Sequence, residues 1–405
     1  MILKVKELKI EAEKPVVIIN VHDAEELGIR PLDRVEIIYE SKKAIAIANV
    51  ARRLINKGTI GIYSEIADIL KVKDGKHIEI IPATRPESIE FIRKKINGSQ
   101  LEGHEIRKII RDVVDHKLSE IELTAFIVSL YNRGMTIDEA AELSIAMAET
   151  GSVLKLNKTV FDKHSIGGVP GDKTSILLVP TIAYAGLTIP KTSSRAITSP
   201  AGTADRFECI APVELSIEEI EKVVKKTNAC LVWGGAVDLA PADDIFIEIE
   251  YPLAINPFLL PSVMAKKKAV NAKYLVIDIP TGRDVKVKSI DEFRKLSKSF
   301  ILLGEKLGIK VKTVSTFAEQ PVGYAIGPAL EAREVLATLI NGHGPYDLID
   351  KTCNIASILM DFAGIKNSKK KAMEIIKAGK AYKKLKEIIS AQGGDEKIKP
   401  EDIEI

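Results

Sequence analysis

The stretch that decides the fold, residues 159–175, reads Thr-Val-Phe-Asp-Lys-His-Ser-Ile-Gly-Gly-Val-Pro-Gly-Asp-Lys-Thr-Ser. It opens with a short apolar strand pattern that ends at Phe161, and after the glycines an apolar run begins like a buried helix. A glycine loop between a strand and a helix presents backbone N–H groups to an anion. The loop is not a Walker A motif, because Asp172 separates Gly171 from Lys173. An anion site and a tight strand-to-helix turn both fit this stretch taken alone.

Composition limits the classes of protein that the chain can belong to. Its 405 residues suggest two to four domains, and 46% hydrophobic and 28% charged residues are typical of an ordinary globular protein. A net charge of +3 with interleaved signs argues against a nucleic-acid surface. Three widely spaced cysteines and unpaired histidines predict a reducing cytoplasm and no metal site. We find neither a signal peptide nor a membrane-length apolar run.

The first 84 residues predict a small β-rich domain. Two segments, 23–35 and 64–76, are similar to each other, and each predicts a short helix, a turn and a strand. Such a duplication is typical of a small pseudo-symmetric barrel, and the half-repeats resemble those of double-psi β-barrels. We see no catalytic constellation in this region and interpret it as an assembly domain.

The following region predicts four helices, near 86–96, 103–116, 119–133 and 136–150. Two capping boxes mark helix starts, one at Thr84 with Glu87 and one at Thr136 with Glu139. We assign residues 85–150 to a helical subdomain. The proline-rich helical segment 241–268 is expected to return to it.

From residue 151 the pattern predicts an α/β domain that covers 151–240 and 269–345. Strands are expected at 159–161, 229–233, 274–279 and 309–314, and helices near 174–186, 216–228, 290–307 and 328–341, which indicates a mostly parallel sheet. Three more helices are expected near 347–364, 367–378 and 380–391. The polar end of segment 346–405 predicts no folded element.

A second polar stretch, residues 191–208, is dense in hydroxyls around one cation, Arg195. A guanidinium binds two phosphate oxygens at once, short hydroxyl side chains fill other acceptor sites, and Gly202 allows close backbone approach. A polar loop is the alternative interpretation. In the first stretch, the side chains expected to face the anion are Lys163, Ser165, Lys173, Thr174 and Ser175.

Together the two stretches resemble a known family. Residues 193–208, Ser-Ser-Arg-Ala-Ile-Thr-Ser-Pro-Ala-Gly-Thr-Ala-Asp-Arg-Phe-Glu, look like the signature of the thymidine and pyrimidine-nucleoside phosphorylases, and residues 163–169 match their phosphate loop. The extra Pro170, with residues 233–244 and 276–282, is similar to the archaeal branch, the AMP phosphorylases, which also carry an N-terminal barrel. Those enzymes continue into a C-terminal α+β domain, which we expect to be absent because the chain ends where it should begin.

The resemblance implies phosphorolysis of a nucleoside 5′-monophosphate to a free base and ribose 1,5-bisphosphate, as a step of nucleotide salvage. The enzyme must hold two anions, position C1′ and protonate the leaving base. No cofactor is implied beyond phosphate as co-substrate. By the match, phosphate is bound by Lys163, Ser165, Ser175, Ser193 and Thr203. AMP is contacted by Gly168, Ser194, Arg195, Ala196, Ile197, Thr198, Ser199, Thr203, Ser262 and Lys286.

Three further positions are left open. Lys266 lies one helical turn after Ser262 and is either a substrate contact or a solvated lysine, as Lys267 and Lys268 are expected to be. His164 matches a histidine near the site, and either moves a proton or orients the loop. At Asn256 the AMP-cleaving branch has an aspartic acid that is the proposed proton donor; an amide cannot transfer that proton. The asparagine is engineered, or natural with Asp243 or Asp244 as the acid, or the mark of a weakened paralogue.

Two other functions compete with AMP phosphorolysis. A pyrimidine-nucleoside phosphorylase would use an arginine to hold the base, but residues 248–253 contain none. A nucleotide-binding paralogue without catalysis fits Asn256, whereas the complete phosphate-binding stretches oppose it. We expect a cytoplasmic enzyme with small-molecule substrates, a homodimer or higher homo-oligomer, and neither nucleic acid nor membrane as partner. Base preference is not decided by the sequence.

Overall fold

The computed structural model describes residues 1–11, 14–196 and 201–405, which form two compact units, Met1–Gly134 and Met135–Ile405. The first unit begins with six strands and two short helices. The strands are β1 (Ile2–Glu7), β2 (Val16–Asn20), β3 (Arg34–Tyr39), β4 (Lys42–Ala51), β5 (Thr59–Ile62) and β6 (His77–Pro82). The helices are α1 (Val21–Leu27) and α2 (Ser64–Leu70).

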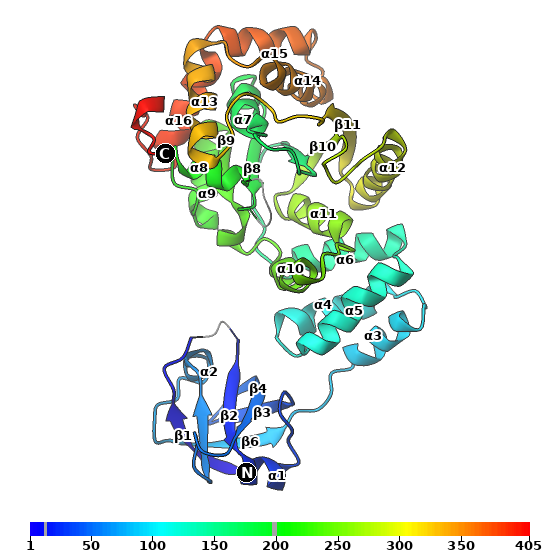
Figure 1. Cartoon of the computed structure of the whole chain (residues 1–405), viewed down its shortest axis with the longest axis vertical. Coiled ribbons are helices and arrows are strands. Elements are labelled where there is room, and N and C mark those ends of the chain that lie inside the picture. The colour runs from blue at the N-terminus through cyan, green and yellow to red at the C-terminus, as the bar shows by residue number, and fades with distance from the viewer. Residues whose placement is uncertain (12–13, 197–200) are drawn as a thin grey trace. The chain divides into compact units, whose positions relative to one another are not determined.

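The six strands close into a barrel in the order β1-β5-β2-β4-β3-β6 (Figure 1). Alternate side chains point inward along each strand, so that Leu3 and Val5 of β1 are buried, as are Val35 and Ile37 of β3. Each predicted repeat forms a helix followed by a strand, α1 with β3 and α2 with β6. The small barrel is therefore confirmed, whereas its double-psi connectivity stays a prediction.

Three helices complete the first unit: α3 (Ser88–Ile96), α4 (Gly103–Val114) and α5 (Glu120–Arg133). The capping box predicted at Thr84 is wrong, because α3 begins only at Ser88 and has no side-chain cap. Pro86 is the physical reason, since a proline disfavours helical backbone at the residue before it. The predicted box at Thr136 is confirmed: Thr136 and Glu139 bond to each other's backbone N–H at the start of α6 (Ile137–Glu149), in the second unit.

The second unit is built on parallel strands. These are β7 (Val160–Ser165), β8 (Ile189–Ser193), β9 (Ala229–Trp233), β10 (Ala272–Thr281) and β11 (Lys310–Phe317). They form a sheet in the order β11-β10-β7 and a pair β8-β9, and one parallel bridge between Val160 and Thr188 joins β7 to β8. Their carboxyl ends therefore lie at one edge, which is where ligands bind in open α/β sheets.

Helices cover both faces of these strands. They are α7 (Thr174–Tyr184), α8 (Thr203–Glu208), α9 (Ile217–Thr227), α10 (Pro241–Leu253), α11 (Leu259–Ala269), α12 (Ile290–Leu307), α13 (Pro328–Asn341), α14 (Tyr346–Phe362), α15 (Ser368–Lys377) and α16 (Lys380–Ala391). Helix α7 is buried along almost its whole length, and α13 to α16 gather around it (Figure 1). Helix α11 packs against α6 and α12.

Three predictions for this unit need correction. Strand β8 was not predicted, because Ile-Pro-Lys-Thr-Ser is short and polar, and β7 continues past Phe161 as far as Ser165. The terminal segment is not without structure: Pro400–Asp402 forms a 3-10 turn, and Ile403 is buried with its carbonyl bonded by Arg333. The predicted division of the chain into four parts stays a prediction. No helix among the described residues is long and apolar enough to cross a membrane.

Candidate active site

The glycine loop joins the end of β7 to the start of α7, as predicted. Gly167, Gly168 and Gly171 have φ angles of 79°, 93° and 73°, which side chains rarely adopt. A Cβ atom at Gly171 would lie 2.5 Å from the Val322 carbonyl oxygen, so the loop is pressed against the segment that follows β11. Thr174 Oγ1, at the first turn of α7, is buried and has no hydrogen-bond partner among the described residues.

Beneath this loop lie two lysines and two aspartates, which we call the charge quartet: Lys163, Asp172, Asp278 and Lys351. Lys351 Nζ lies 3.1 Å from both Asp172 Oδ2 and Asp278 Oδ2. Lys163 Nζ lies 3.5 Å from Asp278 Oδ2. Lys351 therefore contacts both carboxylates, whereas Lys163 contacts Asp278 at the longer distance and is the less tightly paired of the two lysines.

This pairing explains the pKa shifts of Asp172 and Lys351. Burial alone would raise the pKa of Asp172, but the ammonium groups of Lys351 and Lys163 outweigh it and hold that pKa well below its usual range. Burial alone would lower the pKa of Lys351, and Asp172 and Asp278 reverse the effect and raise it. The pairing therefore stabilises the charged forms of Asp172 and Lys351 despite their burial.

Lys173 does not face the predicted anion. Its ammonium donates to the carbonyl oxygens of Val322 and Ala325, both at 3.0 Å, and lies 2.6 Å from Glu334. It therefore fastens the segment after β11 to the start of α7. Ser165 Oγ accepts a hydrogen bond from the Gly167 amide at 3.3 Å, so this predicted phosphate ligand also shapes the loop.

The second predicted stretch leaves β8 at Ser193 and reaches α8 at Thr203. The Asp205 carboxylate accepts from the backbone amides of Ala196 and Gly202, at 2.8 and 2.7 Å, and so closes this loop. Ser193 Oγ donates to the Val232 carbonyl at 3.3 Å. Ser194 is exposed, and the predicted contacts Ile197, Thr198 and Ser199 lie outside the described residues.

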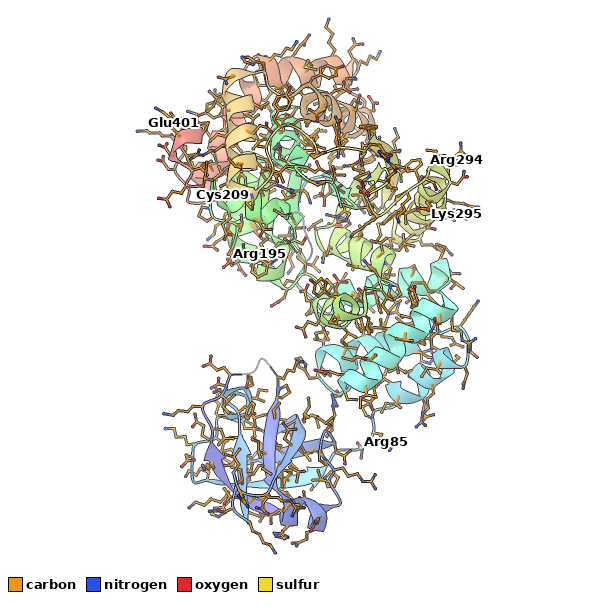
Figure 2. All side chains as sticks on the ribbon, viewed as in Figure 1. Arg85, Arg195, Cys209, Arg294, Lys295 and Glu401 are labelled. Carbon is orange, nitrogen blue, oxygen red and sulfur yellow. The ribbon has the colours of Figure 1, made fainter. Side chains whose placement is uncertain are left out.

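Arg195, labelled in Figure 2, is occupied by carboxylates of its own chain. Its guanidinium donates to both Glu208 oxygens and to Glu214, at 2.5 to 2.8 Å, and lies 4.8 Å from the Trp233 ring centroid. Phosphate binding by Arg195 stays a prediction, and it requires the guanidinium to exchange one of these partners for the ligand.

Helices α10 and α11 carry the remaining predicted residues. Asp243 Oδ2 accepts from Ser262 Oγ and pairs with Lys266 Nζ, both at 2.8 Å. The prediction for Lys267 is wrong, since this lysine is buried and pairs with Asp162 Oδ2 of β7 at 2.6 Å. Lys268 is exposed, as predicted. The Lys267–Asp162 pair thus ties α11 to the strand that precedes the glycine loop.

The remaining predicted residues lie in different environments. Gly168 lies against Lys286, so that a Cβ atom at Gly168 would be 3.5 Å from the Lys286 backbone nitrogen. The pKa of His164 is well below its ordinary value, first because of burial and then because of Lys267, Lys191 and Lys163, so its imidazole is neutral. Asn256 is exposed between α10 and α11.

Sequence reasoning missed Lys351, Asp278 and Lys191. Asp278 carries a readable signal, since it is the charged residue within the apolar run 275–279 of β10, where burial requires a partner. Lys191 Nζ donates to the Thr192 carbonyl at 2.5 Å. Burial, followed by the charge of Lys267, lowers the pKa of Lys191 to about 7. No group of His, Cys, Asp and Glu side chains suited to a metal occurs among the described residues.

Comparison with known domains identifies the family to which the second unit and the helices before it belong. The helical bundle domain of the Glycosyl transferase family matches residues 89–151, and the a/b domain of that family matches residues 157–382. Anthranilate phosphoribosyltransferase from Thermus thermophilus shares the fold, with a TM-score of 0.64 and 20% identity over 75% of this chain and 99% of its own. The fold and both domains are those of the glycosyl transferase family.

Comparison with curated relatives identifies the branch of this family. The AMP phosphorylase of Thermofilum pendens is 50% identical over 404 residues, which cover 100% of this chain and 79% of the relative. Those of Thermococcus kodakarensis and Methanocaldococcus jannaschii are 48% and 47% identical, over 99% and 100% of this chain and 81% of each relative. The chain therefore belongs to the AMP phosphorylase branch of the glycosyl transferase family.

Proposed function

We infer that the protein cleaves AMP with inorganic phosphate to adenine and ribose 1,5-bisphosphate, as a pentosyltransferase. The observation that carries this inference is identity of 46–50% with AMP phosphorylases over essentially the whole chain. A pyrimidine-nucleoside phosphorylase and a non-catalytic paralogue are not favoured by these relatives.

We propose specific roles for the site residues. Phosphate binds at the start of α7 to Lys163 of the charge quartet, Ser165 and Ser175, with Ser193 and Thr203 completing its ligands. A helix start favours an anion through its N–H groups and dipole. The nucleotide contacts Gly168 and Lys286 with one end and Ser262 and Lys266 with the other, and the segment 194–199 binds its phosphate.

The setting of the enzyme is also proposed. Small molecules are its substrates, phosphate is the only co-substrate, and no cofactor takes part. It works in the cytoplasm as a homodimer or higher oligomer, without nucleic acid or membrane. Its site closes over the bound anions, because the exclusion of water prevents hydrolysis from competing with phosphorolysis.

A single incubation tests the activity. The protein is mixed with phosphate and, in separate reactions, AMP, CMP, UMP or thymidine, and free base is measured by chromatography. Adenine from AMP is the expected result, and it should require added phosphate. Base from thymidine alone would overturn the proposal, as would AMP that protects against heat unfolding yet yields no base.

A further inference from the structure

One carboxylate outside the charge quartet contacts two proposed nucleotide ligands at once. Asp243 lies in the first turn of α10 and is fully buried. Ser262 Oγ donates a hydrogen bond to the Asp243 Oδ2 atom, and Lys266 Nζ lies beside the same oxygen, both at 2.8 Å. Asp243 therefore joins the two residues of α11 to which the proposed function assigns one end of the nucleotide.

Ser262 and Lys266 form an open part of α11. They are four residues apart, so their side chains are neighbours on one face of the helix. Both are partly exposed, whereas residues 263–265 between them are buried, as is Lys267. The pair is therefore accessible to a ligand, while Asp243 contacts it from the buried side.

This part of α11 lies near the strand that leads into the glycine loop. Lys267, the residue after Lys266, contacts Asp162 of β7 at 2.6 Å. Burial and then the charge of Lys267 lower the pKa of His164, also in β7, and the charge of Lys266 adds to this shift. Helix α11 therefore holds Ser262 and Lys266 close to the strand that ends at the proposed phosphate site.

The contact with Asp243 decides which groups Ser262 and Lys266 can offer to a ligand. A carboxylate only accepts hydrogen bonds, so the Ser262 hydroxyl directs its proton at Asp243 and leaves its oxygen lone pairs for a ligand. Burial would lower the pKa of Lys266, but Asp243 outweighs burial and raises it, so the ammonium keeps its N–H donors. The pair thus presents an acceptor beside a donor. A carboxylate at this place disfavours a phosphate group, so the pair suits the base end of the nucleotide.

A role in stability alone does not explain the position of Asp243. Helix α10 is already joined to the start of α11 by Phe246, which stacks on Phe258 with ring centroids 4.3 Å apart, and by Glu250, which accepts from the Phe258 amide at 3.1 Å. Both donors to Asp243 converge on Oδ2, whereas Oδ1 is buried and has no hydrogen-bond partner among the described residues. A buried acceptor without a partner costs free energy, so this arrangement requires another explanation.

We propose that Asp243 is a positioning residue that fixes the donor and acceptor pattern of the base site, an assignment that rests on the proposed phosphorolysis of AMP. Adenine carries an amino donor beside a ring-nitrogen acceptor on one edge. The 6-amino group donates to Ser262 Oγ, and the neighbouring ring nitrogen accepts from Lys266 Nζ. Without the Asp243 carboxylate, the Ser262 hydroxyl is free to rotate and to point its proton at the ligand, so the amino group loses its acceptor.

The test compares AMP with purine riboside 5′-monophosphate, a nucleotide that lacks the 6-amino group. The preference for AMP is the ratio of the two kcat/KM values, and any intrinsic difference in reactivity cancels when this ratio is compared between enzymes. We expect Asp243→Asn to lower the preference by about tenfold, and Ser262→Ala by a similar factor, because either change removes the hydrogen bond to the amino group. Glu248→Gln, at an exposed position on the same helix, is the matched control and should leave the preference unchanged.

A double variant shows whether Asp243 acts through Ser262. If it does, Asp243→Asn combined with Ser262→Ala lowers the preference no further than Ser262→Ala alone. Additive losses of preference, or an equal loss of kcat/KM with both nucleotides in Asp243→Asn, would overturn the assignment. If Asp243→Asn does not fold, Ser262→Ala decides: a lowered preference supports the assignment, and an unchanged preference contradicts it.

The proposed function is tested separately, by adenine release from AMP with the wild type. Its absence would refute that function, and the ratio of the dissociation constants of the two nucleotides, measured by calorimetry in the same variants, would then decide the role of Asp243. An active wild type whose preference does not change in Asp243→Asn would refute the role of Asp243 alone.

Discussion

The charge quartet and a second region both bury acidic side chains, but they hold them in different ways. The second region, which we call the hairpin face, consists of Asp243, Phe246 and Glu250 of α10 with Ser262 and Lys266 of α11. In the quartet, Asp172 and Asp278 share the ammonium of Lys351 at 3.1 Å, and the lysines hold the pKa of Asp172 well below its usual range. On the hairpin face, Glu250 accepts a hydrogen bond from the Phe258 backbone amide, and burial raises its pKa to about 7. A buried carboxyl group therefore stays ionised where lysines compensate it, as at Asp172, whereas burial without such compensation raises its pKa, as at Glu250.

The largest expected effect comes from breaking the quartet. Lys351→Met leaves Asp172 and Asp278 with Lys163 alone, and removing one partner from a buried ionic group costs about 3–5 kcal/mol. We expect the free energy of unfolding, measured by urea titration, to fall by that amount. Lys369→Met removes an exposed partner of Asp350 and should cost less than about 1 kcal/mol. Equal costs would show that the quartet is not a compensated unit.

The corresponding change on the hairpin face is Asp243→Asn. Lys266 then loses its counter-charge and Ser262 a charged acceptor, and a hydrogen bond to a charged group contributes about 1.5–3 kcal/mol. We expect a loss of unfolding free energy in this range. Phosphate affinity, measured by calorimetry, should stay near the wild-type value, because the quartet is untouched. A large loss of phosphate binding would mean that the two regions are not independent.

A substitution in the glycine loop is expected to have a smaller effect on the free energy of unfolding. Gly171→Ala places a Cβ atom 2.5 Å from the Val322 oxygen at a φ of 73°. Gly186→Ala is the matched control, because Gly186 also has positive φ, 92°, but has no atom within 4 Å of its Cβ position. The control should lose about 1 kcal/mol in urea denaturation, from backbone strain alone, and Gly171→Ala at least about 1 kcal/mol more. Equal losses would mean that the loop has room to move.

A further expected effect is a dependence of the free energy of unfolding on pH, caused by Lys191. In the unfolded chain a lysine keeps its proton to about pH 10, whereas burial lowers the pKa of folded Lys191 to about 7. Between these values the unfolded chain binds one more proton, so the contribution of Lys191 to stability rises with pH. Relative to Lys191→Met, the wild type should gain at most about 1.4 kcal/mol per pH unit from about pH 7.5 to 9.5. If the difference in unfolding free energy between the wild type and Lys191→Met does not change with pH, the Lys191 ammonium keeps the ordinary pKa of a lysine, which would contradict this prediction.

Much of the fold could be predicted because its signals are local. The helix starts at Thr136 and Ser216 carry side-chain caps within four residues, and α12 and α13 have the predicted bounds. Strand β8 was not predicted, because it contains a proline and polar residues and forms a strand through its pairing with the distant strand β9. The predicted cap at Thr84 failed because Pro86 imposes a restriction on its neighbour that the capping pattern ignores.

The candidate site likewise has features that could be predicted from the sequence and features that only the structure shows. By itself, the sequence determined that a glycine loop joins a strand to a helix before α7, because turn-forming residues and apolar runs are properties of contiguous residues. Only the tertiary structure decided which charges meet: Lys351 reaches Asp172 across 179 residues, and of two neighbouring lysines Lys267 is buried against Asp162 while Lys268 is exposed. Packing makes this choice because an ion pair depends on distance in space, and adjacent helix positions point about 100° apart.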